Sequence, residues 1–314
     1  MQTPLTYKLL RLTIFLAVCQ AFVAAGQTGY VVGWGGNFAG EAAGSSSSGS
    51  STGLVAIAGQ SDIKAIAAGQ AHALALKRDG TVVGWGWNYY GQATVPADLS
   101  NVTAIAAAAN YSLALRSNGT VAIWGEKPDS LQKIFGALKN VVAISAGSDG
   151  ILALELDGTV VAGLHTPKGL SNIVGVAAGT GSHSSQLALK ADGTLVEWNV
   201  SGNETPVPMG LNHVKAIAAG AGFNLALKKD GTVVQWSNGD SEVTQVVSNA
   251  EAIASFGGYS LALKDDGTLI GWGHGRFHPR PVPAGLSDVA GLAVGGDFCL
   301  AITTNSAVAD KFRH

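Results

Sequence analysis

Short apolar runs recur along the chain and are separated by glycine and by polar turn residues. One unit contains an alanine-rich run closed by glycine, "AIAAG" (65–69), a second apolar run, "LALK" (74–77), and the segment "DGTVVGWG" (79–86). Asp-Gly is a signal for a tight hairpin, and β-branched residues and tryptophan favour strands. After residue 25 no segment keeps a helical spacing of apolar residues for ten positions. The pattern therefore predicts three short strands per unit and no helices.

The unit is repeated seven times along the chain. Such regular repetition, at intervals of roughly 40 residues, is typical of an array of one supersecondary unit. The repeat is marked by its turn glycine: Gly29, Gly80, Gly119, Gly158, Gly193, Gly231 and Gly267. A tryptophan follows this glycine in six copies, and Leu164 replaces it in the fourth. The first interval is longer because "GSSSSGSSTG" (44–53) is inserted there, and we interpret this insert as a flexible loop with nothing to bury.

Strands that are apolar on both faces must be covered on both sides, which in an all-β repeat means sheet against sheet. The seven copies predict an all-β, seven-bladed β-propeller over residues 26–304, with the alanine-rich strands at its crowded centre. The chain begins with the last part of a unit, "GYVVGWG" (29–35), and ends with the first part, "VAGLAVGGDFCLAI" (289–302). We therefore expect the N- and C-terminal strands to close the last blade together, followed by a tail at 305–314.

The first residues form a separate segment. Lys8 and Arg11 precede an apolar run that ends at Ala25 and is followed by small residues. This pattern indicates a secretory signal peptide at residues 1–25, and the run is shorter than the roughly 20 residues of a membrane span. We expect a mature chain without a membrane span that is secreted, periplasmic or at the cell surface. A lipoprotein signal at Cys19 is the alternative.

Composition and charge narrow the classes of function. The chain is 47% hydrophobic and 13% charged and contains 43 glycines, which is too apolar for disorder and too glycine-rich for a helical bundle. Its formal net charge of −2 predicts no basic surface for nucleic acid. Cys299 is the one cysteine after the signal peptide, so the mature chain has no internal disulfide. The apolar neighbours of Cys299 predict a small buried side chain.

The repeats resemble those of the regulator of chromosome condensation (RCC1) family. The resemblance rests on segments such as "VTAIAAAANYSLALRSNGTVAIWG" (102–125) and "VKAIAAGAGFNLALKKDGTVVQWS" (214–237), and it extends over about residues 29–304. The opening "VVGWGGNFAGE" (31–41) is most similar to bacterial secreted members of the β-lactamase inhibitor protein-II type. The resemblance implies a seven-bladed propeller used as a protein-binding platform. Guanine-nucleotide exchange, which in the family needs an elaborated loop, is not implied for this chain.

The sequence offers no convergent catalytic grouping. The aspartate of each Asp-Gly-Thr segment recurs because it is a favourable turn residue, and we do not interpret these aspartates as catalytic acids. His274 and His278 are four residues apart, but no carboxylate or cysteine joins them. We therefore predict a protein that is not an enzyme and that has no cofactor and no metal site.

Large apolar residues gather in the loop after the tryptophan in the first, second and seventh copies. These copies become neighbours when the ring closes, and clusters of Tyr, Trp and Arg are typical of binding hot spots. The second copy also carries an aromatic pair where inhibitor-type relatives carry one. We predict a partner-binding patch made of Phe38, Trp87, Tyr89, Tyr90, Arg276 and Phe277.

Aromatic residues also recur two positions before the second apolar run. We interpret this second set as packing between blades, because aromatic residues at repeat-fixed positions usually pack. Its members are His72, Tyr111, Phe223, Tyr259 and Phe298. The preceding position, where inhibitor-type relatives present contact aromatics, holds none in this chain; Ala71 and Asn110 are examples.

These patterns predict an exported, non-enzymatic, monomeric propeller that binds a protein partner, of unknown identity, through its rim loops. The alternative within binding proteins is an inhibitor of a secreted or periplasmic enzyme such as a β-lactamase. The alternatives of another class are a structural component of the cell surface and an enzyme that uses the central channel.

Overall fold

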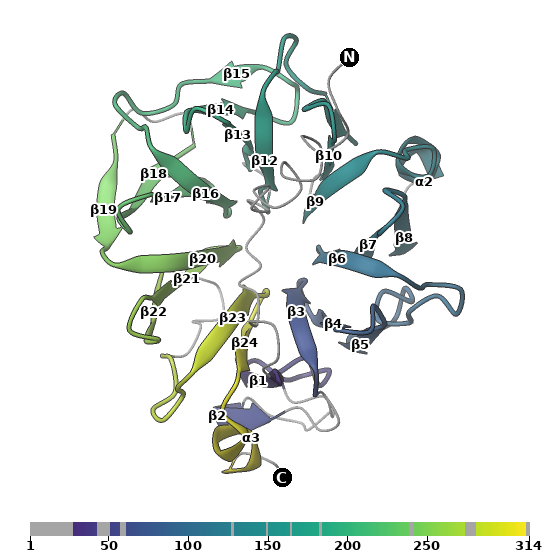
Figure 1. Cartoon of the computed structure of the whole chain (residues 1–314), viewed down its shortest axis with the longest axis vertical. Coiled ribbons are helices and arrows are strands. Elements are labelled where there is room, and N and C mark those ends of the chain that lie inside the picture. Colours follow the sequence, from purple (N-terminus) through teal and green to yellow (C-terminus); the bar gives the residue numbers. More distant parts are fainter. Residues whose placement is uncertain are drawn as a thin grey trace, which may run out of the picture.

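The computed structural model describes residues 28–42, 51–56, 61–126, 129–148, 150–163, 165–181, 184–238, 242–273 and 281–311. Within these ranges the chain forms seven small antiparallel sheets arranged around a common centre (Figure 1). The expected all-β fold is confirmed. The predicted signal peptide, most of the Ser/Gly insert, and both Arg276 and Phe277 lie outside the described residues.

Each sheet, here called a blade, has an inner, a middle and an outer strand. From blade 1 to blade 7 the inner strands are β3 (Ile63–Ala68), β6 (Val102–Ala107), β9 (Val141–Gly147), β12 (Ile173–Ala178), β16 (Val214–Ala219), β20 (Ala250–Phe256) and β23 (Val289–Val294). The middle strands are β4 (His72–Lys77), β7 (Tyr111–Arg116), β10 (Gly150–Glu155), β13 (Gln186–Lys190), β17 (Phe223–Lys228), β21 (Tyr259–Lys264) and β24 (Phe298–Thr303).

The outer strands of blades 1 to 6 follow directly in the chain, whereas blade 7 takes its outer strand from the N-terminal end. They are β5 (Val82–Gly86), β8 (Val121–Gly125), β11 (Val160–Ala162), β14 (Leu195–Trp198), β18 (Val233–Ser237), β22 (Leu269–Gly273) and β1 (Tyr30–Gly35). A fourth strand extends blades 4, 5 and 7, respectively β15 (Glu204–Thr205), β19 (Thr244–Val247) and β2 (Ser51–Ala56).

The inner strands meet at the centre of the molecule. Each contacts the next, from β3 through β6, β9, β12, β16 and β20 to β23, and β23 also contacts β3 (Figure 1). Their sequences are rich in alanine, as in "IKAIAA" of β3 and "VKAIAA" of β16. Small side chains allow so many strands to approach one point at the packing density of a protein core. The predicted central place of the alanine-rich strands is confirmed.

The two ends of the chain share blade 7. Its strand order is β2-β1-β24-β23, and residue pairs between β1 and β24 run from Tyr30 with Thr303 to Gly35 with Phe298. The side chains of β1 join the apolar cluster shared with blade 6 on one face and the cluster shared with blade 1 on the other. The pairing expected between the terminal strands is therefore present, and it places β1 in the core.

The Ser/Gly insert is not loop throughout. Residues 51–53 belong to β2, in which Ser51 pairs with Gly35 and Ala56 pairs with Val32. Strand pairing uses backbone N–H and C=O groups, so a Ser/Gly composition does not prevent it. The interpretation of 44–53 as loop is wrong for these last three residues.

The prediction that the chain has no helices is also wrong. Helix α2 (Asp129–Gly136) follows blade 2 and buries Phe135. Helix α3 (Ser306–Lys311) lies in the segment predicted as a tail, and its Val308 and Ala309 pack on the apolar cluster of blade 7. The side chain of Asn305 caps α3 by accepting a hydrogen bond from the backbone N–H of residue 307 at 3.0 Å. Both helices are shorter than ten residues, so neither gives a helical period in the sequence.

An indole hydrogen bond joins neighbouring blades. Trp85 Nε1 of blade 1 donates to the backbone oxygen of Glu41 at 2.9 Å, and Trp124 Nε1 of blade 2 donates to that of Gln92 at 2.8 Å. Both acceptors lie in the loop that leaves the outer strand of the preceding blade. Each of these tryptophans therefore fixes a blade and the end of the neighbouring loop together.

Blades 4 and 5 supply a side-chain acceptor instead. Glu197, buried in β14, accepts from Trp236 Nε1 at 2.8 Å through Oε2 and from Ser185 Oγ at 2.6 Å through Oε1. Gln235 Oε1 accepts from Trp272 Nε1 at 2.8 Å. In both cases the acceptor residue directly precedes the tryptophan of its own blade, and the donor is the tryptophan of the next blade.

In blades 7 and 1 the loop after the tryptophan supplies the backbone acceptor. In both of these blades the residue directly before the tryptophan is glycine. A side chain at Gly33 would overlap the backbone oxygen of Ala42, and one at Gly84 would overlap that of Ala93. The loop can therefore come close to the outer strand only because this position has no side chain.

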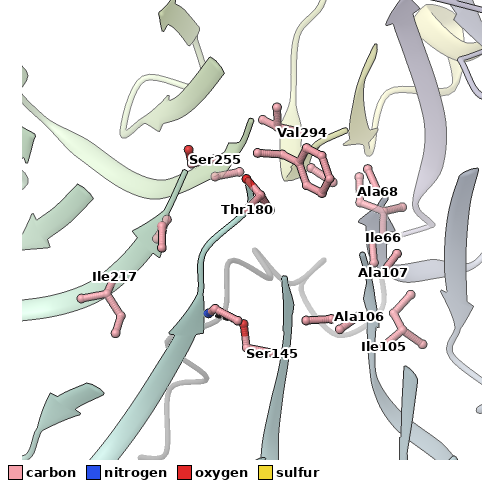
Figure 2. A pocket seen from close by; sticks show the side chains of 18 residues that line it. Ile66, Ala68, Ile105, Ala106, Ala107, Ser145, Thr180, Ile217, Ser255 and Val294 are labelled. Atoms are coloured by element: carbon pink, nitrogen blue, oxygen red, sulfur yellow. Dashed lines mark hydrogen bonds between the residues drawn. The ribbon is translucent and has the colours of Figure 1, made fainter. Parts of the chain in front are cut away.

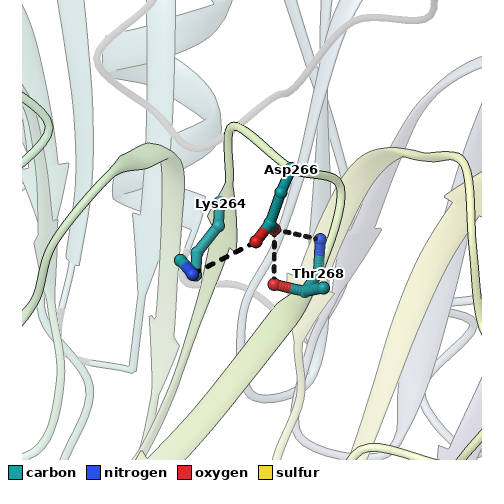
Figure 3. Close-up of polar contacts among 3 residues, drawn as sticks. All are labelled: Lys264, Asp266 and Thr268. Atoms are coloured by element: carbon teal, nitrogen blue, oxygen red, sulfur yellow. Dashed lines mark hydrogen bonds and ion pairs between the residues drawn. The ribbon is translucent and has the colours of Figure 1, made fainter.

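The Asp-Gly-Thr turns hold their own conformation. Asp266 accepts hydrogen bonds from the backbone N–H of Thr268 at 2.9 Å, from Thr268 Oγ1 at 2.6 Å and from Lys264 Nζ at 3.2 Å (Figure 3). These hydrogen bonds, with those from Thr268 the largest, lower the pKa of Asp266 to about 2. Asp79 and Asp192 accept equivalent bonds within their turns. The interpretation of these aspartates as turn residues is confirmed.

Truncation of the chain through residue 36 removes β1 and should destabilise the whole ring. Loss of three buried side chains, Val31, Val32 and Trp34, at roughly 1.5–3 kcal/mol each amounts to about 5–9 kcal/mol, which is comparable to the whole stability of an ordinary domain. Thermal unfolding of the truncated and parent proteins measures the effect. An unchanged melting temperature would contradict the role assigned to β1.

Replacement of Glu197 by alanine leaves two buried donors without an acceptor, so we expect the free energy of unfolding to fall by about 2–5 kcal/mol. Glu197→Gln keeps the volume and one carbonyl oxygen, and it should lose less. Urea unfolding of both variants and the parent tests this ranking. If the alanine variant is as stable as the parent, the indole contact does not join blades 4 and 5 as described.

Candidate functional site

The antiparallel order of each blade separates two edges of the molecule. Outer strands end at one edge, here called the loop rim, which carries loops 36–42 and 87–93. Middle strands end at the opposite edge, here called the turn rim, which carries the Asp-Gly-Thr turns such as 79–81 and 266–268. The described residues of the predicted binding patch, Phe38, Trp87, Tyr89 and Tyr90, all lie on the loop rim.

The loops 36–42 and 87–93 share an internal framework. Asn37 Oδ1 accepts from the backbone N–H of residue 42 at 3.0 Å, and Asn88 Oδ1 accepts from that of residue 93 at 2.8 Å. Glu41 Oε2 accepts from the N–H of residue 39 at 2.7 Å, and Gln92 Oε1 accepts from that of residue 90 at 3.0 Å. These polar residues, which the sequence analysis did not select, were visible there as a repeated "N-x-x-G-E/Q-A" segment.

The aromatic side chains of both loops point to solvent. The exposed fractions are 71% for Phe38, 47% for Trp87, 78% for Tyr89 and 43% for Tyr90. The rings of Trp87 and Tyr89 are stacked with centroids 6.3 Å apart, and Tyr89 and Tyr90 meet edge to face at 4.9 Å. Phe38 holds the place in its loop that Tyr89 holds in the next.

The two aromatic loops lie on adjacent blades. The hydrogen bond from Trp85 Nε1 to the backbone of Glu41 attaches the loop of blade 7 to blade 1, which carries the second loop. Four of the six predicted residues therefore occupy neighbouring positions on one rim. The structure does not test Arg276 and Phe277, which lie outside the described residues.

The second aromatic set is part of the core, as its packing interpretation predicted. Tyr111, Tyr259 and Phe298 are buried, and Phe223 is half-buried. The hydroxyl of Tyr111 donates to the backbone oxygen of Gly147 in the next blade at 2.6 Å. These residues join neighbouring blades and do not belong to the exposed aromatic patch on the loop rim.

His72 occupies the same repeat position in blade 1. It is buried, and its Nε2 lies 2.9 Å from Ser112 Oγ of blade 2. Burial lowers the pKa of His72 to about 4, because the charged imidazolium loses its hydration there. The imidazole is therefore neutral at physiological pH and serves packing between blades.

A small cavity of about 100 Å³ lies at the centre of the molecule (Figure 2). The residues that line it are mostly alanine, isoleucine and valine, with the hydroxyls of Ser145, Thr180 and Ser255. Ser145 Oγ accepts from the N–H of residue 178, and Thr180 Oγ1 accepts from that of residue 257. This lining holds no acid, base or thiol.

Three further observations concern the described part of the chain alone. It contains no group of three or more His, Cys, Asp or Glu residues placed to hold a metal ion. None of its helices is long and apolar enough to cross a membrane. Cys299 is buried, and burial raises the pKa of its thiol, so it is a core residue and not a nucleophile, as expected.

Comparison with known proteins identifies the repeat. Residues 63–92 match the family model of the regulator of chromosome condensation (RCC1) repeat. No curated protein matches the chain. The predicted RCC1-type repeat is thus confirmed, whereas the likeness to β-lactamase inhibitor-type propellers stays a prediction.

Several solved structures share the fold. Yeast RCC1 (Prp20) bound to Kap60 is 18% identical with a TM-score of 0.72, and the match covers 93% of this chain and 92% of that one. Prp20p from Saccharomyces cerevisiae, studied for its binding to Gsp1p and histones, gives the same score and identity with 93% and 95% covered. Human WBSCR16 is 17% identical with a TM-score of 0.70, and 87% and 99% are covered.

Phenylalanine holds the repeat position of His72 in blades 5 and 7. Substitution of His72 by phenylalanine should make the free energy of unfolding less sensitive to acid. The folded pKa of about 4 lies below the unfolded value of 6.5, so this histidine contributes stability above pH 6.5 that is lost as the pH falls toward 4. Between pH 7 and pH 4.5 the parent should lose about 2–3 kcal/mol more than the variant. Urea unfolding at both pH values checks this, and equal losses would refute it.

Proposed function

We propose that this chain is an exported, monomeric, closed seven-bladed RCC1-type propeller that binds a protein partner through its loop rim and catalyses no reaction. The observation that carries the proposal is the exposed aromatic group of Phe38, Trp87, Tyr89 and Tyr90. Exposed aromatics that contact one another, as Trp87, Tyr89 and Tyr90 do, mark an interaction surface more often than isolated ones do.

The loop framework supports a binding role. The loop backbones are held by Asn37, Asn88, Glu41 and Gln92, so folding does not require bulky aromatics at the positions between them. Tyr and Trp provide large contact areas at a low cost in conformational entropy, which is why hot spots are enriched in them. The stacked Trp87 and Tyr89 are already ordered relative to each other, which reduces that cost further.

Structural relatives support the class of function. Prp20 is described in complex with Kap60 and in terms of its binding to Gsp1p and histones, so propellers of this fold bind proteins. At 18% identity the likeness extends to the fold, and none of these partners carries over to this chain. Export is part of the proposal because Lys8, Arg11 and the apolar run that follows them match a signal peptide.

A narrower candidate is inhibition of a secreted or periplasmic enzyme such as a β-lactamase. The exposed edge-to-face pair Tyr89 and Tyr90 favours it, because it stands where inhibitor-type relatives carry an aromatic pair. Inhibition of nitrocefin hydrolysis by a panel of β-lactamases tests this candidate separately from the broader proposal.

Replacement of Tyr89 and Tyr90 together by alanine should keep the melting temperature within a few degrees of the parent and weaken partner binding by about 2–4 kcal/mol, a factor of roughly 30–1000. The partner is first isolated with residues 26–314 from secreted and cell-wall proteins, and its affinity is then measured with purified components. Met209→Ala, which alters an exposed apolar residue away from both aromatic loops, is the matched control.

Two outcomes would overturn the proposed site. Unfolding of the double variant would mean that the rings are core residues. A folded variant with parental affinity for every partner would place the binding surface elsewhere.

A further inference from the structure

A pocket of about 550 Å³ opens on the turn rim, where blades 3, 4 and 5 meet. Its walls are the beginnings of three inner strands, the ends of two middle strands and the turns beside them. The volume falls within the range of small-molecule sites in proteins, roughly 300–1,000 Å³. The aromatic patch lies on the opposite rim, so this pocket is separate from the proposed protein-binding surface.

The apolar part of the pocket comes from equivalent positions of the repeat. Val142 and Val174 are the second residues of β9 and β12, and both are only partly buried by their own blades. Leu154 and Leu189 come from the ends of β10 and β13. Leu156, in the turn after β10, has 50% of its surface exposed although it is a large apolar side chain. A bound apolar group would remove this surface from water, at about 25 cal/mol per Å².

The charged part of the pocket is mixed. Lys190, Lys215 and Lys229 line it, against the carboxylates Glu155 and Asp157. Asp157 is committed to its own turn, because its Oδ1 accepts the backbone N–H of residue 159 at 2.9 Å. This hydrogen bond lowers the pKa of Asp157, so its carboxylate stays charged, and Asp192 interacts electrostatically with Lys190. Lys215 and Lys229 remain as the pocket lysines without such a carboxylate.

Two of these lysines differ from their neighbours on the turn rim. Lys228 forms an ion pair with the aspartate two residues later at 3.9 Å, and Lys264 does the same at 3.2 Å. Figure 3 shows the pair made by Lys264. Lys215 and Lys229 form no ion pair with any carboxylate among the described residues. A lysine without a carboxylate partner beside an apolar wall is suited to an anionic ligand with an apolar body.

We propose that the pocket between blades 3, 4 and 5 binds a small amphiphilic carboxylate, with its apolar body on Val142, Val174 and Leu156 and its carboxylate at Lys215 and Lys229. Binding at this rim leaves loops 36–42 and 87–93 free. The site does not depend on the proposed protein-binding function, and either can hold without the other.

The test uses isothermal titration of the mature chain with dodecanoate below its micelle concentration. Dodecyltrimethylammonium, which has the same tail and a cationic head, is the ligand control. We expect saturable one-to-one binding of dodecanoate and at least tenfold weaker binding of the cation. No saturable binding, or equal binding of the two ligands, would overturn the proposal.

The double variant Lys215→Glu/Lys229→Glu should bind dodecanoate at least tenfold more weakly than the parent. The matched control is Lys64→Glu, because Lys64 is the second residue of β3 and so holds the same repeat position as Lys215 on a blade outside the pocket. The control should retain the parental affinity within about twofold. Parental affinity in the double variant, or an equal loss in the control, would contradict the assigned head-group site.

A milder variant protects the test against misfolding. Lys215→Gln/Lys229→Gln removes the charges without reversing them and should give an intermediate loss of affinity. Leu156→Ser should also weaken dodecanoate binding, because it removes apolar contact and leaves the lysines in place. Unchanged affinity in Leu156→Ser at a parental melting temperature would refute the apolar half of the site.

Discussion

The contact between neighbouring blades at the tryptophan position is the constraint on which the rest of the structure depends. A buried indole N–H without an acceptor costs about 1–3 kcal/mol. Trp85, Trp124, Trp236 and Trp272 find an oxygen at the neighbouring outer strand, whereas Nε1 of Trp34 and of Trp198 is buried without a hydrogen-bond partner among the described residues. Blades 7 and 1 provide a backbone oxygen, from Glu41 and Gln92, and blades 4 and 5 provide the side chains of Glu197 and Gln235. Where the acceptor is a backbone oxygen, the loop after the tryptophan lies against the next blade.

This constraint separates residues that the fold needs from residues that it leaves free. Where the acceptor is a loop backbone, both ends of the loop are fixed, and the side chains between them, such as Phe38 and Tyr89, are held in a defined place without contributing to the core. The opposite rim is independent, because its turns are closed by their own Asp–Thr hydrogen bonds. The same set of blades can therefore present the exposed aromatic residues on one edge and the pocket on the other.

The sequence predicted the features that each repeat determines by itself. It did not reveal the contacts that form between repeats. The half-units at the two ends predicted the pairing of β1 with β24, because only complementary halves make a full unit. The role of Glu197 could not be predicted, because its partner Trp236 lies in the next blade, 39 residues away along the chain. Helix α3 was missed because it is only six residues long. The strand that begins at Ser51 was missed because strand pairing uses backbone groups, which the Ser/Gly composition does not reveal. The pocket on the turn rim is formed by residues of three blades. No single sequence segment therefore indicates that Lys215 lines it.

The central claim is that the loop rim, and not the turn rim, meets the protein partner. Site-directed photo-crosslinking measures this directly, with p-benzoylphenylalanine placed at position 89 on the loop rim or at position 79 on the turn rim. The account predicts that the purified partner is captured from position 89 and not from position 79, in two proteins with the same melting temperature as the parent. Capture from position 79 alone would contradict it.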